Sequence, residues 1–68
     1  MLEMIRNAKK LQRSKFRIEV LEEGKINYTV YKVSEKDFYN IVDNIPLDNK
    51  ILFKAYIGEC LYCRHIKA

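Results

Sequence analysis

The stretch that decides the fold runs from residue 15 to residue 33 and reads KFRIEVLEEGKINYTVYKV. Its first part alternates in polarity: Phe16, Ile18 and Val20 share one phase, and charged residues stand between them. A period of two is typical of a β-strand with one buried face. The pattern therefore predicts a strand whose phenylalanine, isoleucine and valine face a core.

The second part of this stretch predicts the returning strand of a β-hairpin. Residues 21–25 are expected to form the turn, because Gly24 can adopt the positive φ that a tight hairpin needs. Residues 26–33 then alternate again. One phase holds Ile26, Tyr28 and Val30, and the other holds Asn27, Thr29 and Tyr31. We therefore expect a hairpin over about residues 15–33, the first phase facing the core.

Helical spacing flanks the hairpin on both sides. Residues 2–12 carry Leu2, Ile5, Ala8 and Leu11 at intervals of three, which predicts a first helix. Ser34 is placed to cap a second helix, and Pro46 to end it. The apolar stripe of this second helix is Phe38, Ile41, Val42 and Ile45.

The C-terminal third predicts further strands. Residues 48–50 read as a turn, residues 51–57 as a strand with Phe53 and Ala55 inward, and Gly58 as a turn or bulge. Residues 60–66 continue as a fourth strand or extend the third. The sequence thus predicts one α+β domain over residues 1–68, with a small antiparallel sheet of three to four strands, one or two helices, and the order α-β-β-α-β-β.

Size and composition narrow the class of protein. The chain has 68 residues, so we expect a single domain. No apolar run approaches the ~20 residues that span a bilayer, and the first residues do not resemble a secretory signal. Two cysteines are too few for the disulfide framework of a small secreted domain. A cytoplasmic protein without a membrane partner is expected.

Catalytic motifs are missing from the sequence. It contains no glycine-rich phosphate loop, no paired-carboxylate motif and no metalloprotease helix. The single histidine, His65, has no recognisable nucleophile and acid beside it in the sequence, so we expect a solvent-exposed side chain near the C-terminus. The chain is predicted not to be an enzyme and to need no cofactor.

Cys60, Cys63 and His65 are weak candidates for a metal site. A closed zinc site needs four ligands, and the chain offers only these three thiol and imidazole groups. In a regular strand the two cysteines would also face opposite sides. A redox pair would need a following helix, for which too few residues follow. The preferred interpretation is two small, half-buried apolar side chains, with no metal bound.

Positive charge is concentrated at the N-terminal end. The net charge is +4, but residues 1–17 carry six basic side chains against one glutamate, and residues 18–50 carry an excess of acids. The candidates for contact with nucleic-acid phosphates are Arg6, Lys9, Lys10, Arg13, Lys15 and Arg17. Helical spacing would place Arg6, Lys10 and Arg13 near one face. No ribonucleoprotein motif, GXXG loop or zinc finger accompanies them.

The chain has five tyrosines, which is many for a small sheet with one face exposed to solvent. The candidates for a protein interface are Tyr28, Tyr31, Tyr56 and Tyr62, because tyrosine offers a large contact area and a polar tip. Tyr31, Tyr39, Tyr56 and Tyr62 are expected on the phase opposite to the core. The N-terminal helix could cover that second sheet face; otherwise a larger protein or a second copy of the chain would do so.

Two functions follow as expectations. The first is a small non-catalytic protein that binds a larger protein through its tyrosines, such as a phage or mobile-element inhibitor or regulator of a host defence or transcription protein. The alternative is a small DNA- or RNA-binding protein that uses its basic N-terminal segment. Fold class alone does not distinguish them.

Overall fold

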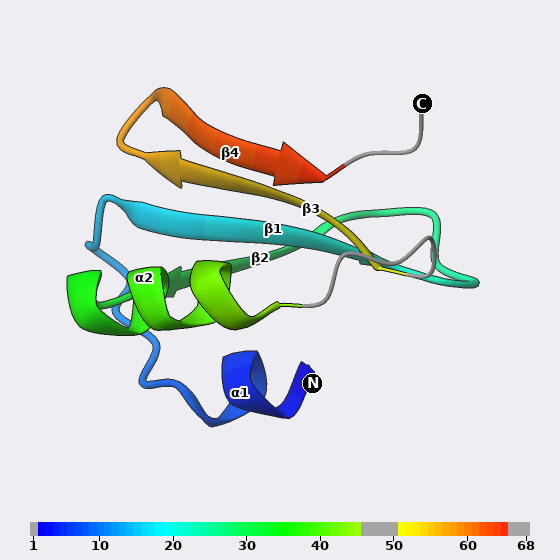
Figure 1. Cartoon of the computed structure of the whole chain (residues 1–68), viewed down its shortest axis with the longest axis horizontal. Helices are drawn as coiled ribbons and strands as arrows, with labels where there is room; N and C mark the ends of the chain where they lie inside the picture. The colour runs from blue at the N-terminus through cyan, green and yellow to red at the C-terminus, as the bar shows by residue number, and fades with distance from the viewer. Residues whose placement is uncertain (1, 46–50, 66–68) are drawn as a thin grey trace.

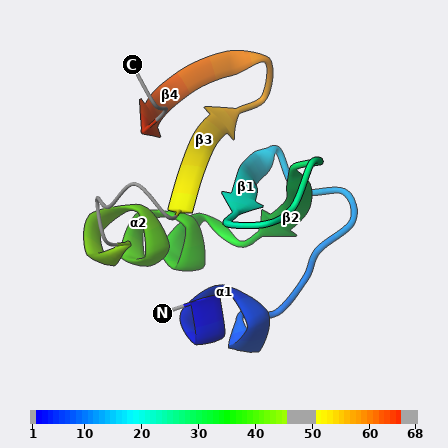
Figure 2. The same ribbon diagram turned by 90° about the vertical axis from the view of Figure 1, so that its right-hand side faces the viewer.

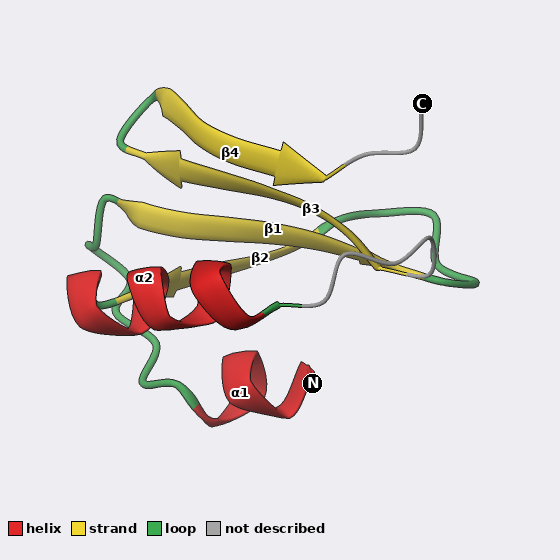
Figure 3. Cartoon of the chain, viewed as in Figure 1, coloured by secondary structure: helices red, strands yellow, loops and turns green. Residues whose placement is uncertain are grey.

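The computed structural model describes residues 2–45 and 51–65. Over these residues the chain forms two helices and four strands (Figures 1 and 3). They are α1 (Leu2–Asn7), β1 (Phe16–Glu22), β2 (Thr29–Val33), α2 (Glu35–Asn44), β3 (Ile51–Ile57) and β4 (Cys60–His65). The expected α+β class and the order α-β-β-α-β-β are confirmed. The turn expected at residues 48–50 and the proline at 46 lie outside the described residues.

The four strands form one antiparallel sheet in the order β2-β1-β3-β4. Both helices lie on the same face of this sheet, as the turned view in Figure 2 shows. One interpretation of the tyrosine content required α1 to cover the second face of the sheet. The structure shows that α1 does not cover it. We call the face that carries no helix the open face.

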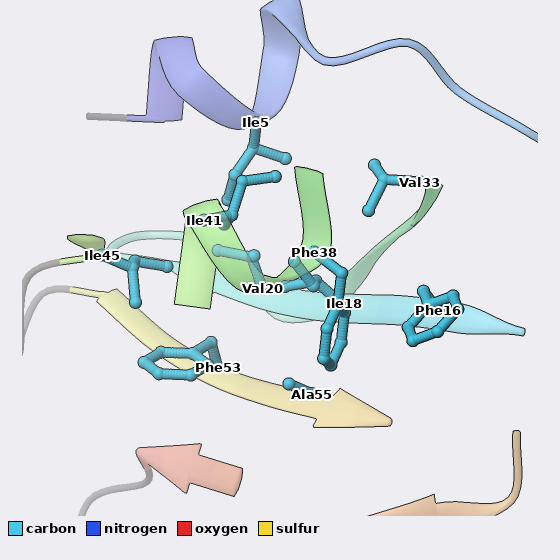
Figure 4. Close-up of a cluster of buried hydrophobic side chains, with 10 residues drawn as sticks. All are labelled: Ile5, Phe16, Ile18, Val20, Val33, Phe38, Ile41, Ile45, Phe53 and Ala55. Carbon is cyan, nitrogen blue, oxygen red and sulfur yellow. The ribbon is translucent and has the colours of Figure 1, made fainter. Parts of the chain in front are cut away.

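The core lies between the sheet and the two helices (Figure 4). The buried apolar side chains are Ile5, Phe16, Ile18, Val20, Val33, Phe38, Ile41, Ile45, Phe53 and Ala55. Fully burying one such large side chain contributes about 1.5–3 kcal/mol. No polar or charged residue is buried in the described part of the chain. The core therefore holds the sheet and both helices together by apolar packing.

The hairpin forms with its returning strand in the opposite phase from the one expected. β2 begins at Thr29, and its register pairs Ile18 with Tyr31 and Phe16 with Val33. Tyr31 therefore faces the helices and packs against the core, whereas Val30 faces the open side and is 51% exposed. The connection is also longer than expected, and Gly24 within it has the expected positive φ of 84°.

The first helix is shorter than expected, because the chain leaves it to cover the outer edge of β2. The backbone N–H of Leu11 donates to the Lys32 carbonyl at 2.9 Å, and Lys10 forms a β-bridge with Val33. An uncovered edge strand would leave these backbone groups unpaired. The pairing of residues 10 and 11 replaces the second half of the expected helix.

The second helix agrees with the sequence pattern at both ends. Ser34 Oγ accepts the N–H of Asp37 at 3.2 Å, which is the expected N-cap. Ile45 has an extended backbone, as the residue before a proline favours. Phe38 and Ile41 point into the core between these ends. Local signals alone therefore locate this helix.

β3 and β4 form the second hairpin, which turns at Gly58 with a φ of 63°. The pairing shifts register beside Ala55 and Tyr56, so β4 carries a bulge. Tyr62 is the extra residue, since Leu61 pairs with Tyr56 and Cys63 pairs with Ala55. This bulge changes which β4 side chains share a face.

Candidate functional site

The open face of the sheet gathers charged and aromatic side chains from three strands. The register places Arg17 of β1 between Lys32 of β2 and Tyr56 of β3. The next outward-facing row places Glu19 of β1 beside Lys54 of β3. Residues paired in this way point to the same side of a sheet. These rows bring together side chains that are far apart in the sequence.

Five of these side chains form a continuous chain of contacts, which we call the open-face cluster: Tyr56, Arg17, Glu19, Lys54 and Tyr28. Arg17 Cζ lies 4.3 Å from the Tyr56 ring centroid, and Arg17 Nε lies 3.0 Å from Glu19 Oε2. Lys54 Nζ lies 3.9 Å from Glu19 Oε1 and 4.3 Å from the Tyr28 ring centroid. One carboxylate thus holds two cations, and each cation lies over a tyrosine ring.

The cluster leaves one buried donor without an acceptor. Arg17 Nε is buried and has no hydrogen-bond partner among the described residues, because its contact with Glu19 has the charge but not the geometry of a hydrogen bond. An unsatisfied buried donor costs about 1–3 kcal/mol. The side chains of Arg17 and Lys54 are 32% and 30% exposed, so a ligand can reach both cations.

Two more cations flank the open-face cluster. Lys32 pairs with Arg17 on one side, and Arg64 pairs with Lys54 on the other. Both are exposed, and Lys32 Nζ also donates to the Gln12 carbonyl at 3.3 Å. Across the four strands the open face therefore presents four cations against one carboxylate. The paired strands of the open face thus carry a net positive charge.

The basic residues expected to contact nucleic acid do not form one surface. Because α1 ends at Asn7, the helical face expected for Arg6, Lys10 and Arg13 does not exist. Arg6 lies 3.5 Å from Glu22, and Lys10 donates its ammonium to the carbonyls of Ile5, Arg6 and Ala8 at the end of α1.

The remaining basic candidates also lie on separate parts of the surface. Lys9 and Arg13 are exposed on the connection between α1 and β1, and Lys15 lies over the Phe16 ring at 5.6 Å. Only Arg17 lies in the open-face cluster. A shallow hollow at the outer edge of β2 is lined by Lys10, Gln12, Val30, Tyr31 and Lys32.

The four interface tyrosines are also divided between surfaces. Tyr28 and Tyr56 belong to the open-face cluster. Tyr31 faces the helices, with Lys10 Nζ 5.4 Å from its ring centroid, so the expectation that it faces away from the core is wrong. Tyr62 is directed to the helix side by the β4 bulge, where its ring lies 5.5 Å from Phe38.

Tyr62 belongs to an aromatic cluster that is partly exposed. Its ring lies 5.7 Å from that of Tyr39, and both pack against Phe38. Tyr39 is 37% exposed and Tyr62 is 48% exposed. These two rings form a second accessible surface, on the helix side of the molecule, and they do not share a sheet face with Tyr56.

Cys60, Cys63 and His65 all lie on β4, and two expectations about them need correction. Because of the bulge, Cys60 pairs with Ile57 and Cys63 with Ala55, so both cysteines lie on the helix-facing side rather than on opposite sides. His65 was expected to be exposed to solvent. It is instead half-buried, with its ring 6.2 Å from that of Phe53.

The two thiols differ in environment. Cys60 is exposed, whereas Cys63 packs against the core as the sequence interpretation expected. Burial raises the pKa of the Cys63 thiol, and the nearby carboxylate of Asp43 raises this pKa further. Within the described ranges, no three His, Cys, Asp or Glu side chains gather as a metal site would require.

The sequence pattern did not identify Glu19, Lys32, Lys54 or Arg64 as site residues. The alternation of β1 and β3 places Glu19 and Lys54 in the outward phase, which is a usable signal. Their contact depends on the pairing of β1 with β3, two strands separated by β2 and α2 in the sequence.

This chain matches no protein-family model, no curated protein sequence and no solved structure in the comparisons made with each. In the part of the chain that the structure describes, neither helix has the length and apolar character to cross a bilayer. The chemistry of the open face and of the aromatic cluster is therefore the basis for a function.

Proposed function

We propose that this protein is a non-catalytic binding protein and that it binds nucleic acid on the open face of its sheet. The open-face cluster is the observation that carries the proposal. It joins two cations and two tyrosine rings on one accessible surface, with Lys32 and Arg64 on either side. Cations bind phosphates and aromatic rings stack on bases, so the two groups together suit nucleic acid.

The open face fits this ligand better than the N-terminal segment does. Lys10 is occupied by the carbonyls at the end of α1, and Arg6 is paired with Glu22. On the open face Lys32 and Arg64 are both exposed, and Lys32 Nζ makes one donation, to the Gln12 carbonyl at 3.3 Å. The Arg17 side chain is 32% exposed, so the accessible part of its guanidinium can donate to a phosphate oxygen.

The test compares two double variants that remove the same charge. Lys32→Ala/Arg64→Ala takes two exposed cations from the open face, and Lys9→Ala/Lys36→Ala takes two exposed cations from elsewhere. Binding of fluorescein-labelled oligonucleotides is measured by anisotropy from 50 mM to 200 mM salt. We expect the open-face variant to lose about tenfold in affinity and the slope of log K against log salt to flatten by about 1.4.

The control variant is expected to keep most of the wild-type affinity. Equal losses in the two double variants would mean that only net charge matters and would contradict a site on the open face. Failure of the wild-type protein to bind any oligonucleotide at 50 mM salt would contradict nucleic-acid binding altogether.

A second candidate function is the binding of a larger protein, such as the host target of a phage or mobile-element inhibitor. The exposed rings of Tyr39 and Tyr62 favour it, because accessible tyrosines are enriched at protein interfaces. A partner retained from a nuclease-treated bacterial lysate by the wild type, and lost with Tyr62→Ser but not with Lys32→Ala/Arg64→Ala, would support this function. Retention of the same proteins by all three baits would contradict it.

A further inference from the structure

On the basis of the proposed nucleic-acid function, we infer that the ligand is a single strand whose bases stack at Tyr56 and at Tyr28. Each ring already carries a cation about as close as stacking allows, at 4.3 Å from the ring centroid. A base can stack on the planar guanidinium of Arg17 or take its place on Tyr56, and on Tyr28 it would take the place of the Lys54 ammonium. Bases inside a duplex are already stacked and paired, so only an unpaired strand can use both rings.

The elements that project from the sheet do not suit a double helix. A helix or a two-stranded ribbon can enter a major groove. The β1–β2 hairpin has a ribbon shape, but Glu22 there is paired with Arg6, and Glu23 stands near Lys25, so its turn carries no excess of positive charge to hold two phosphate backbones. The exposed side of α2 carries Glu35 and Asp43 against one cation, Lys36, and α1 has only six residues.

The separation of the Tyr56 and Tyr28 rings sets the shortest nucleic-acid strand that can reach both. Tyr56 pairs with Arg17, and Tyr28 directly precedes Thr29, which pairs with Val20. Tyr28 therefore falls beside Leu21, four residues from Arg17 along β1, which is about 13 Å. Stacked bases follow each other every 3.4 Å or so, so the bases on the two rings are not neighbours. A fully stacked single strand of about five nucleotides is the shortest that spans this distance.

Glu19 acts as a positioning residue in this arrangement. In the free protein its carboxylate lies 3.0 Å from Arg17 Nε and 3.9 Å from Lys54 Nζ, which keeps both cations beside their rings. Phosphates that lie between the two stacked bases would compete with Glu19 for the same cations. The nucleic acid thus finds both cations already in place, but the Glu19 carboxylate repels its phosphates.

The experiment compares oligo(dT) of 2, 4, 6 and 12 nucleotides with a 12-base-pair duplex, using the full chain at 50 mM salt. Binding is followed by anisotropy and by the protein's own tyrosine fluorescence, which stacking quenches. We expect the single-stranded 12-mer to bind at least about tenfold more tightly than the duplex, with affinity rising steeply up to about four to six nucleotides.

Ring variants separate stacking from charge. Tyr56→Leu and Tyr28→Leu keep apolar volume but remove the ring, and we expect each to lower single-strand affinity about tenfold. Tyr56→Phe and Tyr28→Phe are the matched controls and are expected to bind as the wild type does. Circular dichroism of each variant checks that the sheet is intact.

The outcomes distinguish this inference from the function on which it rests. Duplex binding as tight as single-strand binding, or leucine variants that bind like the phenylalanine controls, would overturn stacking of a single strand. The proposed function would still stand if Lys32→Ala/Arg64→Ala weakened that binding. If neither oligonucleotide bound, or only a protein partner did, both would fall. The comparison of wild-type affinities does not depend on any variant folding.

Discussion

Arg17 of β1 and Tyr56 of β3 lie directly opposite each other on the open face, with the guanidinium carbon 4.3 Å from the ring centroid. The two residues are joined by the antiparallel pairing of β1 with β3. Two residues further along β1, Glu19 balances the charge of Arg17 at 3.0 Å. This arrangement makes an otherwise ordinary solvent-facing sheet surface into a structured site.

Glu19→Gln is expected to strengthen nucleic-acid binding. The substitution removes the one carboxylate among the four open-face cations and frees Arg17 and Lys54 for phosphates. We expect affinity at 50 mM salt to rise about three- to tenfold, with a steeper salt dependence. Glu35→Gln, which removes the same charge from α2, is the control. An equal gain in both variants, or a loss in Glu19→Gln, would contradict the role given to Glu19.

Lys10→Met is expected to destabilise the fold. The ammonium of Lys10 donates to the carbonyls of Ile5, Arg6 and Ala8, which closes the end of α1. Losing this cap, while keeping the length of the side chain, should lower the free energy of unfolding by about 1 kcal/mol. Urea unfolding followed by circular dichroism measures it. Lys9→Met, at an exposed neighbouring position, should leave the free energy nearly unchanged.

Ser34→Ala is expected to weaken α2. Ser34 Oγ accepts the N–H of Asp37 at 3.2 Å, and loss of such a cap costs about 1 kcal/mol. For a domain of this size the melting temperature should fall by roughly 4–8 °C. Ser34→Asp keeps an acceptor at the cap and should restore most of the loss. A Ser34→Ala protein that melts like the wild type would show that this cap does not stabilise the helix.

Phe38→Ala is expected to remove most of the stability of the protein. Phe38 is fully buried and its ring packs against those of Phe16, Tyr39 and Tyr62. Truncating a buried phenylalanine costs about 3–5 kcal/mol, whereas a domain of this length has roughly 3–10 kcal/mol in total. Tyr39→Ala, which truncates a partly exposed ring, should cost clearly less in the same urea titration. Equal losses would contradict the central position of Phe38.

Cys60 is expected to react with iodoacetamide faster than Cys63 at pH 8. Burial and Asp43 both raise the pKa of the Cys63 thiol, so a smaller fraction is thiolate at a given pH. Peptide mapping by mass spectrometry gives the two rates. Asp43→Asn should speed alkylation of Cys63 without changing Cys60, and unfolding in urea should make the two rates similar.

The raised pKa of the Cys63 thiol also makes the stability of the protein depend on pH. Because the folded state favours the neutral Cys63 thiol, its contribution to stability is present below the unfolded pKa of about 8.5 and is lost as pH rises above it. Cys63→Ala should therefore reduce the fall in melting temperature between pH 8 and pH 10. A fall identical to that of the wild type would contradict this.

Local sequence patterns determined much of the secondary structure. The alternation of Phe16, Ile18 and Val20 predicted β1 and its buried face, and Ser34 with the stripe through Phe38 and Ile41 predicted α2. These signals suffice because strand alternation and helix capping depend on neighbours a few residues away. The alternation within residues 51–57 likewise placed Lys54 and Tyr56 on the outward phase of β3.

Register, however, was decided by tertiary structure. The longer connection after Glu22 moved β2 by one phase, which turned Tyr31 inward and Val30 outward, and the bulge at Tyr62 placed Cys60 and Cys63 on one side. A shift of one residue reverses every side chain of a strand, and pairing across the sheet, not local preference, sets that shift.

The sequence by itself therefore determined the fold class, the second helix and the buried faces of β1 and β3. Only the tertiary structure decided that both helices lie on one face, and that Arg17 and Glu19 meet Lys54 and Tyr56 on the other. The physical reason is that contacts between β1 and β3 join residues about 29 to 41 positions apart, so nothing in either segment alone encodes their partner.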